Sequence, residues 1–160
     1  PSPQCRKDSA QEDVEDDGAA SPLANRRSSW DKESADSKWS SLADAVGGLT
    51  LGADPVASAM LHAAAAQGRH LDAFVVRKEG KAHGLQRRIE GPDVTDRDVV
   101  AVEDTSTTGG SVLPAVEALR EVGARVSAVA VIVDRGAGDA VRSAGLDYLA
   151  AYSLDDLGLS

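Results

Sequence analysis

Short apolar runs alternate along the chain with longer polar stretches, from about residue 43 to the end. The runs lie at 44–50, 71–76, 99–102, 126–133 and 148–152, and the run 126–133 is rich in β-branched residues. Continuous runs of this length are typical of strands that are covered on both faces, as in a parallel sheet. This part of the chain is therefore predicted to contain a largely buried sheet.

Between these runs, apolar residues recur at helical spacing. Val56, Met60 and Ala63 form one such stripe, for which Asp54 is the predicted N-cap and Gly68 the stop. Further helices are predicted from Val112 to Val122 and from Asp139 to Ala144. Strands that alternate with helices predict an α/β fold, in which a parallel sheet is flanked by helices and joined by right-handed crossovers.

Residues 1–41 follow neither period. They contain nine serines and mixed charge clusters, so they offer too little apolar area to offset the entropy of ordering. We predict a disordered or aberrant segment over 1–41, followed by a core domain over 42–160. Trp30 and Trp39 are the only residues of the segment 1–41 that suggest docking onto the core, and a helical turn is expected near Trp39 and Leu42.

The charge balance excludes several functions. Seventeen Lys and Arg against 26 Asp and Glu give a net charge of −9, the wrong sign for non-specific binding to nucleic acid. The longest apolar stretch, 126–133, is far shorter than the ~20 residues that span a bilayer. Cys5 has no partner for a disulfide, and no Cys/His cluster has zinc-binding spacing. These features predict a cytoplasmic protein that binds neither nucleic acid nor membrane.

The chemistry concentrates where the strand at 99–102 ends. Glu103 and Asp104 are followed by a run of hydroxyls and glycines that opens into a helix at Val112. Free N–H groups at a helix start, with nearby hydroxyls, form a cradle for phosphate. Carboxylates repel phosphate, so the two acids are expected to bind sugar hydroxyls or a magnesium ion. A phosphorylated ribose satisfies both halves of the motif.

The segment 103–111, with sequence EDTSTTGGS, resembles the phosphoribosyl-pyrophosphate signature of the type I phosphoribosyltransferases. Neither GxxxxGK[ST] nor GxGxxG occurs in the chain. The segment 76–84, with sequence VRKEGKAHG, resembles the mobile catalytic loop of the orotate phosphoribosyltransferases within that family. Its density of cations suits a strongly anionic ligand even without the resemblance.

The resemblance implies a type I phosphoribosyltransferase fold and a set of roles for individual residues. Lys81, Arg77 and His83 would be catalytic, with His83 donating a hydrogen bond rather than acting as a base. Orotate would contact Thr107 and Arg135. Phosphoribosyl pyrophosphate would contact Arg77, Lys78, Lys81, His83, Glu103, Asp104, Thr105, Ser106, Thr107, Thr108, Gly109, Gly110 and Ser111.

The implied reaction is a pentosyl transfer. Orotate takes the phosphoribosyl group of 5-phospho-α-D-ribose 1-diphosphate, giving orotidine 5′-monophosphate and diphosphate in pyrimidine (UMP) biosynthesis. The resemblance also implies Mg²⁺, bound mainly through the diphosphate substrate, and a homodimer in which Arg77 and Lys81 act on the neighbouring subunit's site.

The chain departs from the family in two places. Gly47–Gly52 resembles the pyrophosphate loop, but Thr50 and Leu51 stand where many members carry Tyr and Lys. The family's N-terminal hood has no counterpart in 1–41, so the hood is expected to be missing. Three alternatives follow: a non-catalytic phosphoribosyl-pyrophosphate-binding module or regulator, a transferase for another base such as a purine, and a truncated or mis-translated product with a crippled site.

Overall fold

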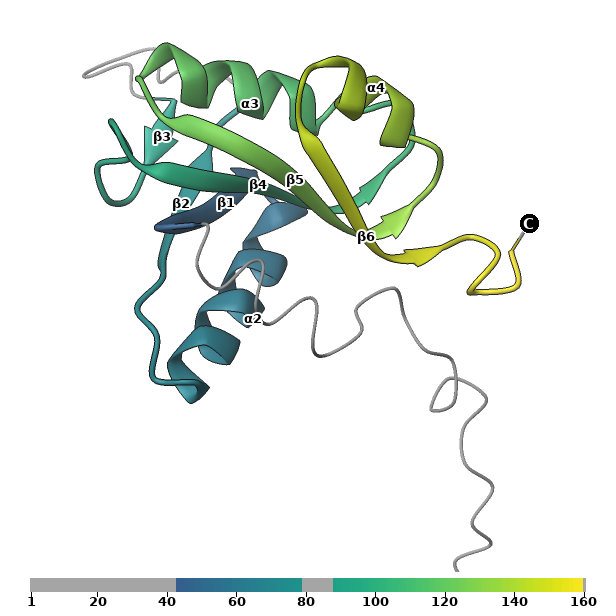
Figure 1. The fold of residues 1–160 in the computed structure, drawn as a ribbon, viewed down its shortest axis with the longest axis horizontal. Helices are drawn as coiled ribbons and strands as arrows, with labels where there is room; N and C mark the ends of the chain where they lie inside the picture. The colour runs from purple at the N-terminus through teal and green to yellow at the C-terminus, as the bar shows by residue number, and fades with distance from the viewer. Residues whose placement is uncertain (1–42, 79–87, 160) are drawn as a thin grey trace, which may run out of the picture.

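A computed structural model describes residues 43–78 and 88–159 (Figure 1). In chain order the elements are β1 (Ala45–Leu49), α2 (Ala53–Ala66), β2 (Asp72–Val76), β3 (Ile89–Glu90), β4 (Asp98–Ser106), α3 (Val112–Glu121), β5 (Arg125–Asp134), α4 (Gly138–Ser143) and β6 (Asp147–Ser153). The predictions for residues 1–41 lie outside the described residues.

The strands form one six-stranded sheet in the order β3-β2-β1-β4-β5-β6. Every neighbouring pair is parallel except β2 and β3, which run antiparallel. Because β1, β2, β4, β5 and β6 point the same way, their carboxyl ends meet at one edge of the sheet. Ligands of open α/β sheets bind at this edge.

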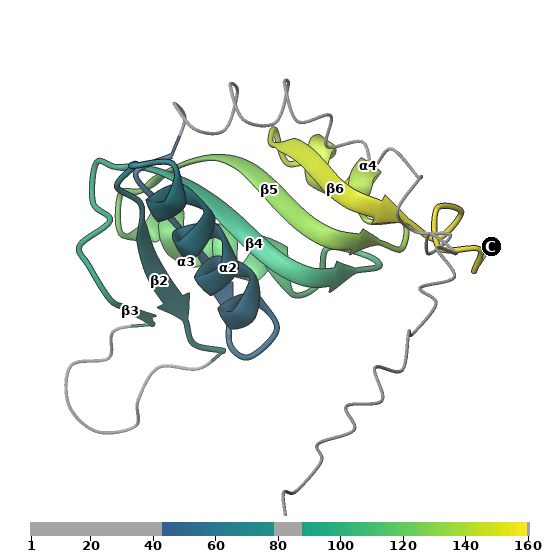
Figure 2. The ribbon, with the colours of Figure 1, turned by 90° about the horizontal axis from the view of Figure 1, so that it is seen from below.

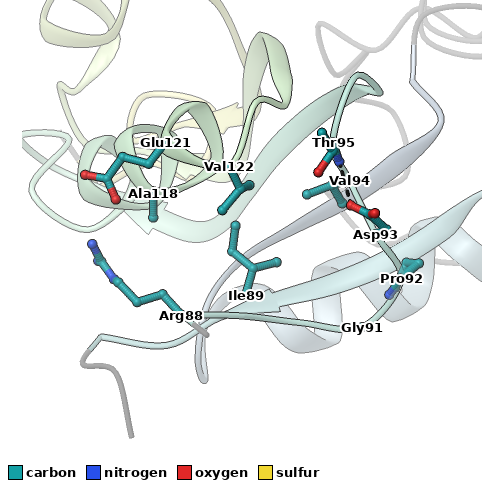
Figure 3. Close-up of a pocket in the computed structure, with 10 residues that line it drawn as sticks. All are labelled: Arg88, Ile89, Gly91, Pro92, Asp93, Val94, Thr95, Ala118, Glu121 and Val122. Carbon is teal, nitrogen blue, oxygen red and sulfur yellow. Dashed lines mark hydrogen bonds between the residues drawn. The ribbon is translucent and has the colours of Figure 1, made fainter. Parts of the chain in front are cut away.

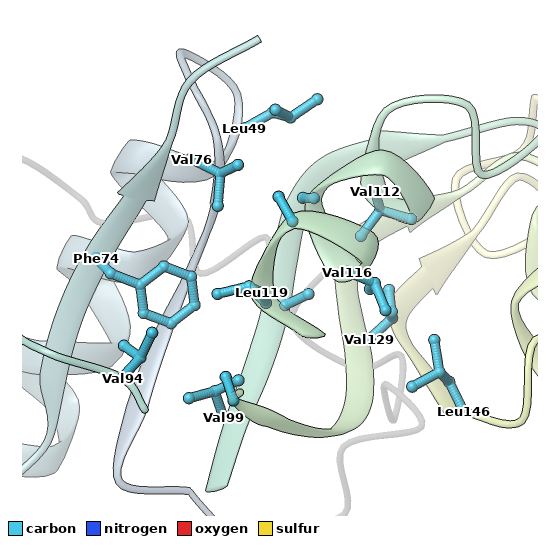
Figure 4. Packing of buried hydrophobic residues seen from close by; sticks show 14 of the residues in the cluster. Leu49, Phe74, Val76, Val94, Val99, Val112, Val116, Leu119, Val129 and Leu146 are labelled. Carbon is cyan, nitrogen blue, oxygen red and sulfur yellow. The ribbon is translucent and has the colours of Figure 1, made fainter. Parts of the chain in front are cut away.

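Helices cover both faces of the sheet, with α3 and α4 on one side and α2 on the other (Figures 1 and 2). On the α3 side, Phe74 packs with Val99, Leu119 and Val129 (Figure 4). A second cluster on the α2 side joins β1, α2, β4 and β5 and contains Val46, Val56, Val100, Val102, Ala128 and Ala130. The predicted mostly parallel α/β sheet is confirmed, with a core of small aliphatic side chains.

Two local predictions were wrong, and one strand was missed. Helix α2 begins at Ala53 with Gly52 as its N-cap, so Asp54 is not the N-cap but lies in the first turn. There its negative charge stabilises the helix by interacting with the positive end of the helix dipole. Strand β4 continues through Ser106, because residues 103–106 keep their pairing with β5. Strand β3 was not predicted at all: its two residues pair with β2 within a long polar stretch and give no periodic signal.

Candidate functional site

The two predicted acids lie near the carboxyl end of β4 and differ in exposure. The Glu103 side chain is buried, whereas Asp104 is exposed at the carboxyl edge of the sheet. Each carboxylate accepts a hydrogen bond from the following backbone N–H, at 3.2 Å for Glu103 and 2.6 Å for Asp104. The strand therefore presents one enclosed and one accessible carboxyl group side by side.

Burial raises the pKa of Glu103 to about 7. The neighbouring Asp104 charge adds to the rise, while the Asp104 N–H and the positive charge of Lys78 oppose it. Lys78, two residues beyond the end of β2, is therefore near enough to Glu103 for their charges to interact. A carboxyl group with a pKa near neutrality at such an edge is typical of a functional site.

The loop between β1 and α2 closes over these acids. A Cβ on Gly52 would overlap Glu103 Oε1 and come within 2.9 Å of Asp104 Oδ1, so any other residue there would have to displace the two carboxylates. The loop is held by a hydrogen bond from Thr50 N to Val76 O, at 3.1 Å. Leu51, where many family members carry a cation, is 83% exposed. The backbone of this loop therefore borders any ligand of the acids.

The predicted phosphate loop runs from the end of β4 into α3. Thr105, Thr107, Thr108, Gly110 and Ser111 are exposed. Ser106, in contrast, is buried within β4. Gly109 has a φ of 77°, a conformation that favours glycine, and its carbonyl accepts a hydrogen bond from Leu113 N at 2.9 Å. No side chain caps the start of α3. The exposed hydroxyls and the first N–H groups of this helix can therefore bind an anion.

Arg135 lies beside this loop, as predicted from its place after β5. Its backbone N–H donates to Ser106 O at 2.8 Å, and Ser106 pairs with Asp134 in the sheet register. The exposed side chain of Arg135 is thus one strand away from Thr107. The two residues predicted to contact orotate are brought to neighbouring positions on the same edge.

The turn that carries Arg135 is organised by Asp134. Its Oδ1 accepts hydrogen bonds from Gly136 N at 2.8 Å, Ala137 N at 3.0 Å and the Tyr148 hydroxyl at 2.9 Å. Burial and this bond to a carboxylate raise the pKa of Tyr148 well above its usual range. Sequence reasoning missed this support, because nothing in the pattern of residues 147–153 links Tyr148 to a turn fourteen residues earlier.

Arg77 and Lys78, the described residues of the predicted catalytic loop, follow β2. The Arg77 guanidinium forms a bidentate ion pair with Glu90 of β3, with Nε–Oε1 2.7 Å and Nη2–Oε2 3.2 Å. Lys78 is exposed. Lys81 and His83 lie outside the described residues, so their predicted roles stay predictions.

A separate cavity of about 490 Å³ lies away from the phosphate loop (Figure 3). It is bordered by Arg88 and Ile89, the loop 91–95 and the last turn of α3 with Glu121 and Val122. None of the predicted ligand-binding residues lines it. The candidate site is thus the open edge formed by the strand ends and their loops rather than this cavity.

Within the described ranges, no three His, Cys, Asp or Glu side chains group closely enough to hold a metal ion. The paired acids Glu103 and Asp104 can offer oxygen ligands to a cation that a bound diphosphate also holds, as Mg²⁺ prefers. No helix in the described part of the chain is long and apolar enough to cross a membrane.

Comparison with known proteins gives consistent similarities. A protein named orotate phosphoribosyltransferase from Streptomyces coelicolor is 71% identical over 119 residues, which cover 72% of this chain and 65% of the relative. One of the same name from Corynebacterium glutamicum is 60% identical, covering 73% and 63%. The chain thus spans slightly less than two thirds of the length of these relatives.

Solved structures agree. The structure of Mycobacterium tuberculosis orotate phosphoribosyltransferase in complex with 5-phospho-α-D-ribosyl 1-diphosphate has a TM-score of 0.67 and 48% identity, covering 80% of this chain and 72% of that one. The family model for the phosphoribosyl transferase domain matches residues 42–148. That match takes in the acids, the phosphate loop and Arg135, and the chain accordingly belongs to the phosphoribosyltransferase domain family.

Proposed function

We propose that the chain is the core of an orotate phosphoribosyltransferase, a pentosyltransferase of pyrimidine (UMP) biosynthesis that makes orotidine 5′-monophosphate and diphosphate. The observation that carries the proposal is the meeting of Glu103, Asp104, the loop 105–111 and Arg135 at one sheet edge. The 71% identity to a protein of that name supports it. The domain itself would extend over 42–160.

Phosphoribosyl pyrophosphate would lie along the end of β4. Its 5′-phosphate would accept hydrogen bonds from the exposed hydroxyls of the loop and from the first N–H groups of α3. Its ribose hydroxyls would donate to Glu103 and Asp104. The loop 47–52 lies directly against both acids at Gly52, so a diphosphate bound at the backbone of this loop would lie beside them.

The acids also fit Mg²⁺. When bound through the diphosphate, Mg²⁺ neutralises negative charge on the leaving group. The exposed Asp104 would hold a water or hydroxyl of this complex, while the buried Glu103 would change its protonation as the cation arrives. The chain's own contribution is to orient the sugar rather than to enclose the metal.

In the reaction, the bond from ribose C1 to the diphosphate oxygen breaks and its electron pair leaves with diphosphate. A ring nitrogen of orotate forms the new bond to C1, and its proton passes to solvent. Positive side chains near the leaving oxygen stabilise the charge that develops. Lys78, Lys81, Arg77 and His83 would supply this stabilisation, and closure of their loop would exclude water from the activated sugar.

Orotate would be held by its carboxylate. A guanidinium matches a carboxylate with two parallel hydrogen bonds, and Arg135 is exposed beside Thr107. This pairing favours orotate over an uncharged purine.

We further propose a cytoplasmic homodimer with shared sites, in which Arg77 and Lys81 of one subunit serve the site of the other. A non-catalytic phosphoribosyl-pyrophosphate-binding module is the second candidate. It is favoured by one observation: the exposed Leu51 offers no cation at the loop 47–52.

The deciding experiment follows the loss of orotate absorbance with Mg²⁺ and phosphoribosyl pyrophosphate, omitting each in turn. Turnover that needs both supports the proposal, and Lys81→Ala is then expected to reduce it by about 10²-fold or more. Arg120→Ala, an exposed arginine on α3, is the matched control and should keep full turnover. Binding of phosphoribosyl pyrophosphate by calorimetry without turnover would favour the binding module instead.

A further inference from the structure

The cavity between β3 and the last turn of α3 has no part in the function proposed above. Its volume of about 490 Å³ falls within the range of roughly 300–1,000 Å³ that is usual for small-molecule sites. None of the residues assigned to phosphoribosyl pyrophosphate or orotate lines it. The cavity is therefore available for a different ligand.

Much of the cavity wall is apolar. Val94 and Ala118 are buried, and the side chains of Ile89 and Val122 point toward one another from β3 and α3 (Figure 3). Such a wall binds a hydrocarbon group but does not orient it, whereas a few polar groups fix the identity of a ligand. The polar residues of the cavity therefore decide which ligand it takes.

Two side chains of opposite charge, Arg88 and Glu121, face each other on one side of the cavity (Figure 3). Arg88 Nε is enclosed and has no hydrogen-bond partner among the described residues. Within the described ranges, no ion pair joins the two side chains. An enclosed donor without an acceptor is unfavourable, so Arg88 Nε is a position where a ligand oxygen would be stabilised.

Both charged residues are carried by regular structure. The Arg88 carbonyl accepts a hydrogen bond from Arg77 N at 2.7 Å, and the next residue, Ile89, pairs with Val76 of the sheet. Glu121 is the last residue of α3. Their spacing is therefore set by the packing of α3 on the sheet, and a site built on such elements holds its polar groups in place before a ligand arrives.

The charges around the cavity favour a ligand that carries both signs. Arg88 is the only cation among the described lining residues, whereas Asp93 and Glu121 are acidic. Asp93 Oδ1 already accepts a hydrogen bond from Thr95 N at 2.9 Å, which leaves Glu121 as the better acceptor for a ligand. A simple anion would be repelled by the two carboxylates, and a simple cation would leave Arg88 Nε without an acceptor. A zwitterion satisfies both charged groups.

We propose that this cavity binds an α-amino acid with an apolar side chain. The carboxylate of the ligand accepts a hydrogen bond from Arg88 Nε, and its ammonium group donates to Glu121. Its hydrocarbon side chain packs against Ile89, Val94 and Val122. The site is separate from the transferase site, so its test is binding and does not depend on turnover.

Calorimetric titration of the full chain with L-leucine tests the proposal, together with two analogues. 3-Methylbutylamine lacks the carboxylate and 4-methylpentanoate lacks the ammonium group. Each should bind about tenfold or more weakly than L-leucine, as expected when a hydrogen bond between charged groups is lost. Amide shifts in two-dimensional NMR should map L-leucine to Ile89, Val94 and Ala118.

Two variants assign the contacts. Arg88→Gln should weaken L-leucine binding about tenfold or more without weakening that of 3-methylbutylamine, because the amine has no carboxylate to lose. Glu121→Gln should weaken L-leucine binding to a similar extent without weakening that of 4-methylpentanoate. Glu117→Gln, an exposed acid one turn earlier on α3 and outside the cavity, is the matched control and should keep the wild-type affinity.

Far-UV circular dichroism verifies the fold of each variant. The absence of saturable L-leucine binding at millimolar concentrations would overturn the proposal. So would wild-type affinity for L-leucine in both Arg88→Gln and Glu121→Gln, or amide shifts confined to the loop 105–111. Tighter binding of uracil than of L-leucine would also overturn it, because the cavity would then take a planar base rather than an amino acid.

Discussion

Gly52 lies against the Glu103 carboxylate with no space for a side chain between them. A methyl group at Gly52 would overlap Oε1 of Glu103 and come within 2.9 Å of Asp104 Oδ1. The backbone of the loop 47–52 and the carboxylates of Glu103 and Asp104 are thus packed as one unit. Gly52→Ala is expected to displace both carboxylates and to weaken phosphoribosyl-pyrophosphate binding about tenfold or more, since overpacking costs about 1–3 kcal/mol.

Calorimetric titration with Mg²⁺ and phosphoribosyl pyrophosphate measures this effect. Gly68→Ala is the control, because a Cβ there meets no atom within 4 Å although its φ of 70° makes alanine mildly strained. It should lower stability slightly and leave affinity intact. Equal affinity for wild type and Gly52→Ala would show that the loop and the acids move independently.

Glu103 gives a pH dependence of stability with a definite sign. Its folded-state pKa of about 7 lies above the ordinary value of 4.5, so the folded chain keeps a proton that the unfolded chain loses. Stability should therefore fall as pH rises from about 4.5 to 7, by up to about 3 kcal/mol. Glu103→Gln removes this dependence. The free energy of unfolding of the variant, relative to that of wild type, should therefore increase as pH rises through this range.

Urea unfolding at several pH values measures the difference, with Glu117→Gln on the exposed face of α3 as control. The same Glu103→Gln protein should bind phosphoribosyl pyrophosphate more weakly, because the amide cannot take the negative charge that attracts Mg²⁺. A parallel pH profile for wild type and Glu103→Gln would contradict the assignment of this carboxyl group as the titrating one.

Much of this architecture was accessible from sequence pattern. The β-branched runs at 99–102 and 126–133 predicted the central strands, because a strand buried on both faces has no polar positions. The acids and the glycine-rich loop were predicted together because they follow the strand directly. Their placement beside Arg135 then follows from the rule that parallel strands end at one edge.

What the pattern could not supply depends on tertiary contacts. The two-residue β3 exists only through its pairing with β2, and the Arg77–Glu90 ion pair depends on that pairing. The unequal burial of Glu103 and Asp104 depends on packing around β4, which no spacing of two adjacent acids reveals. The N-cap of α2 was misassigned because the demand for glycine at residue 52 comes from β4 rather than from the helix.

The ion pair with Glu90 keeps the Arg77 guanidinium from contacting the diphosphate, which is its proposed role in the reaction. Both side chains are about 40% exposed, so the pair contributes at most about 1 kcal/mol to stability. Glu90→Gln should leave the melting temperature nearly unchanged and tighten diphosphate binding a few-fold, because Arg77 is released. Asp98→Asn, which breaks the exposed Asp98–Arg125 pair elsewhere, is the control for charge removal. Unchanged diphosphate affinity in Glu90→Gln would separate Arg77 from the diphosphate site.

The proposed shared sites can be tested by mixing subunits. Arg77→Ala and Asp104→Asn should each abolish most turnover, since one removes a cation from the leaving group and the other a ribose ligand. A mixed dimer holds one site with both defects and one with neither, so co-refolded subunits should recover up to about a quarter of wild-type activity by random pairing. No recovery after verified subunit exchange would mean that Arg77 serves its own subunit.

The position of Arg135 should depend on Asp134, whose Oδ1 accepts three hydrogen bonds in the turn. Asp134→Ala removes the one oxygen that accepts all three hydrogen bonds, so we expect the turn to loosen and Arg135 to lose its position beside Thr107. The KM for orotate should rise about tenfold or more, as expected when a hydrogen bond to a charged group worth about 1.5–3 kcal/mol is lost. The KM for phosphoribosyl pyrophosphate should stay unchanged, because the acids and the loop that follows them are on β4.

Asp134→Asn keeps a carbonyl oxygen at the same place and should restore most of the orotate affinity, whereas a merely structural defect would raise both KM values together. Steady-state kinetics with each substrate varied in turn decides between the two, and a rise in the phosphoribosyl-pyrophosphate KM alone would move Arg135 out of the orotate site.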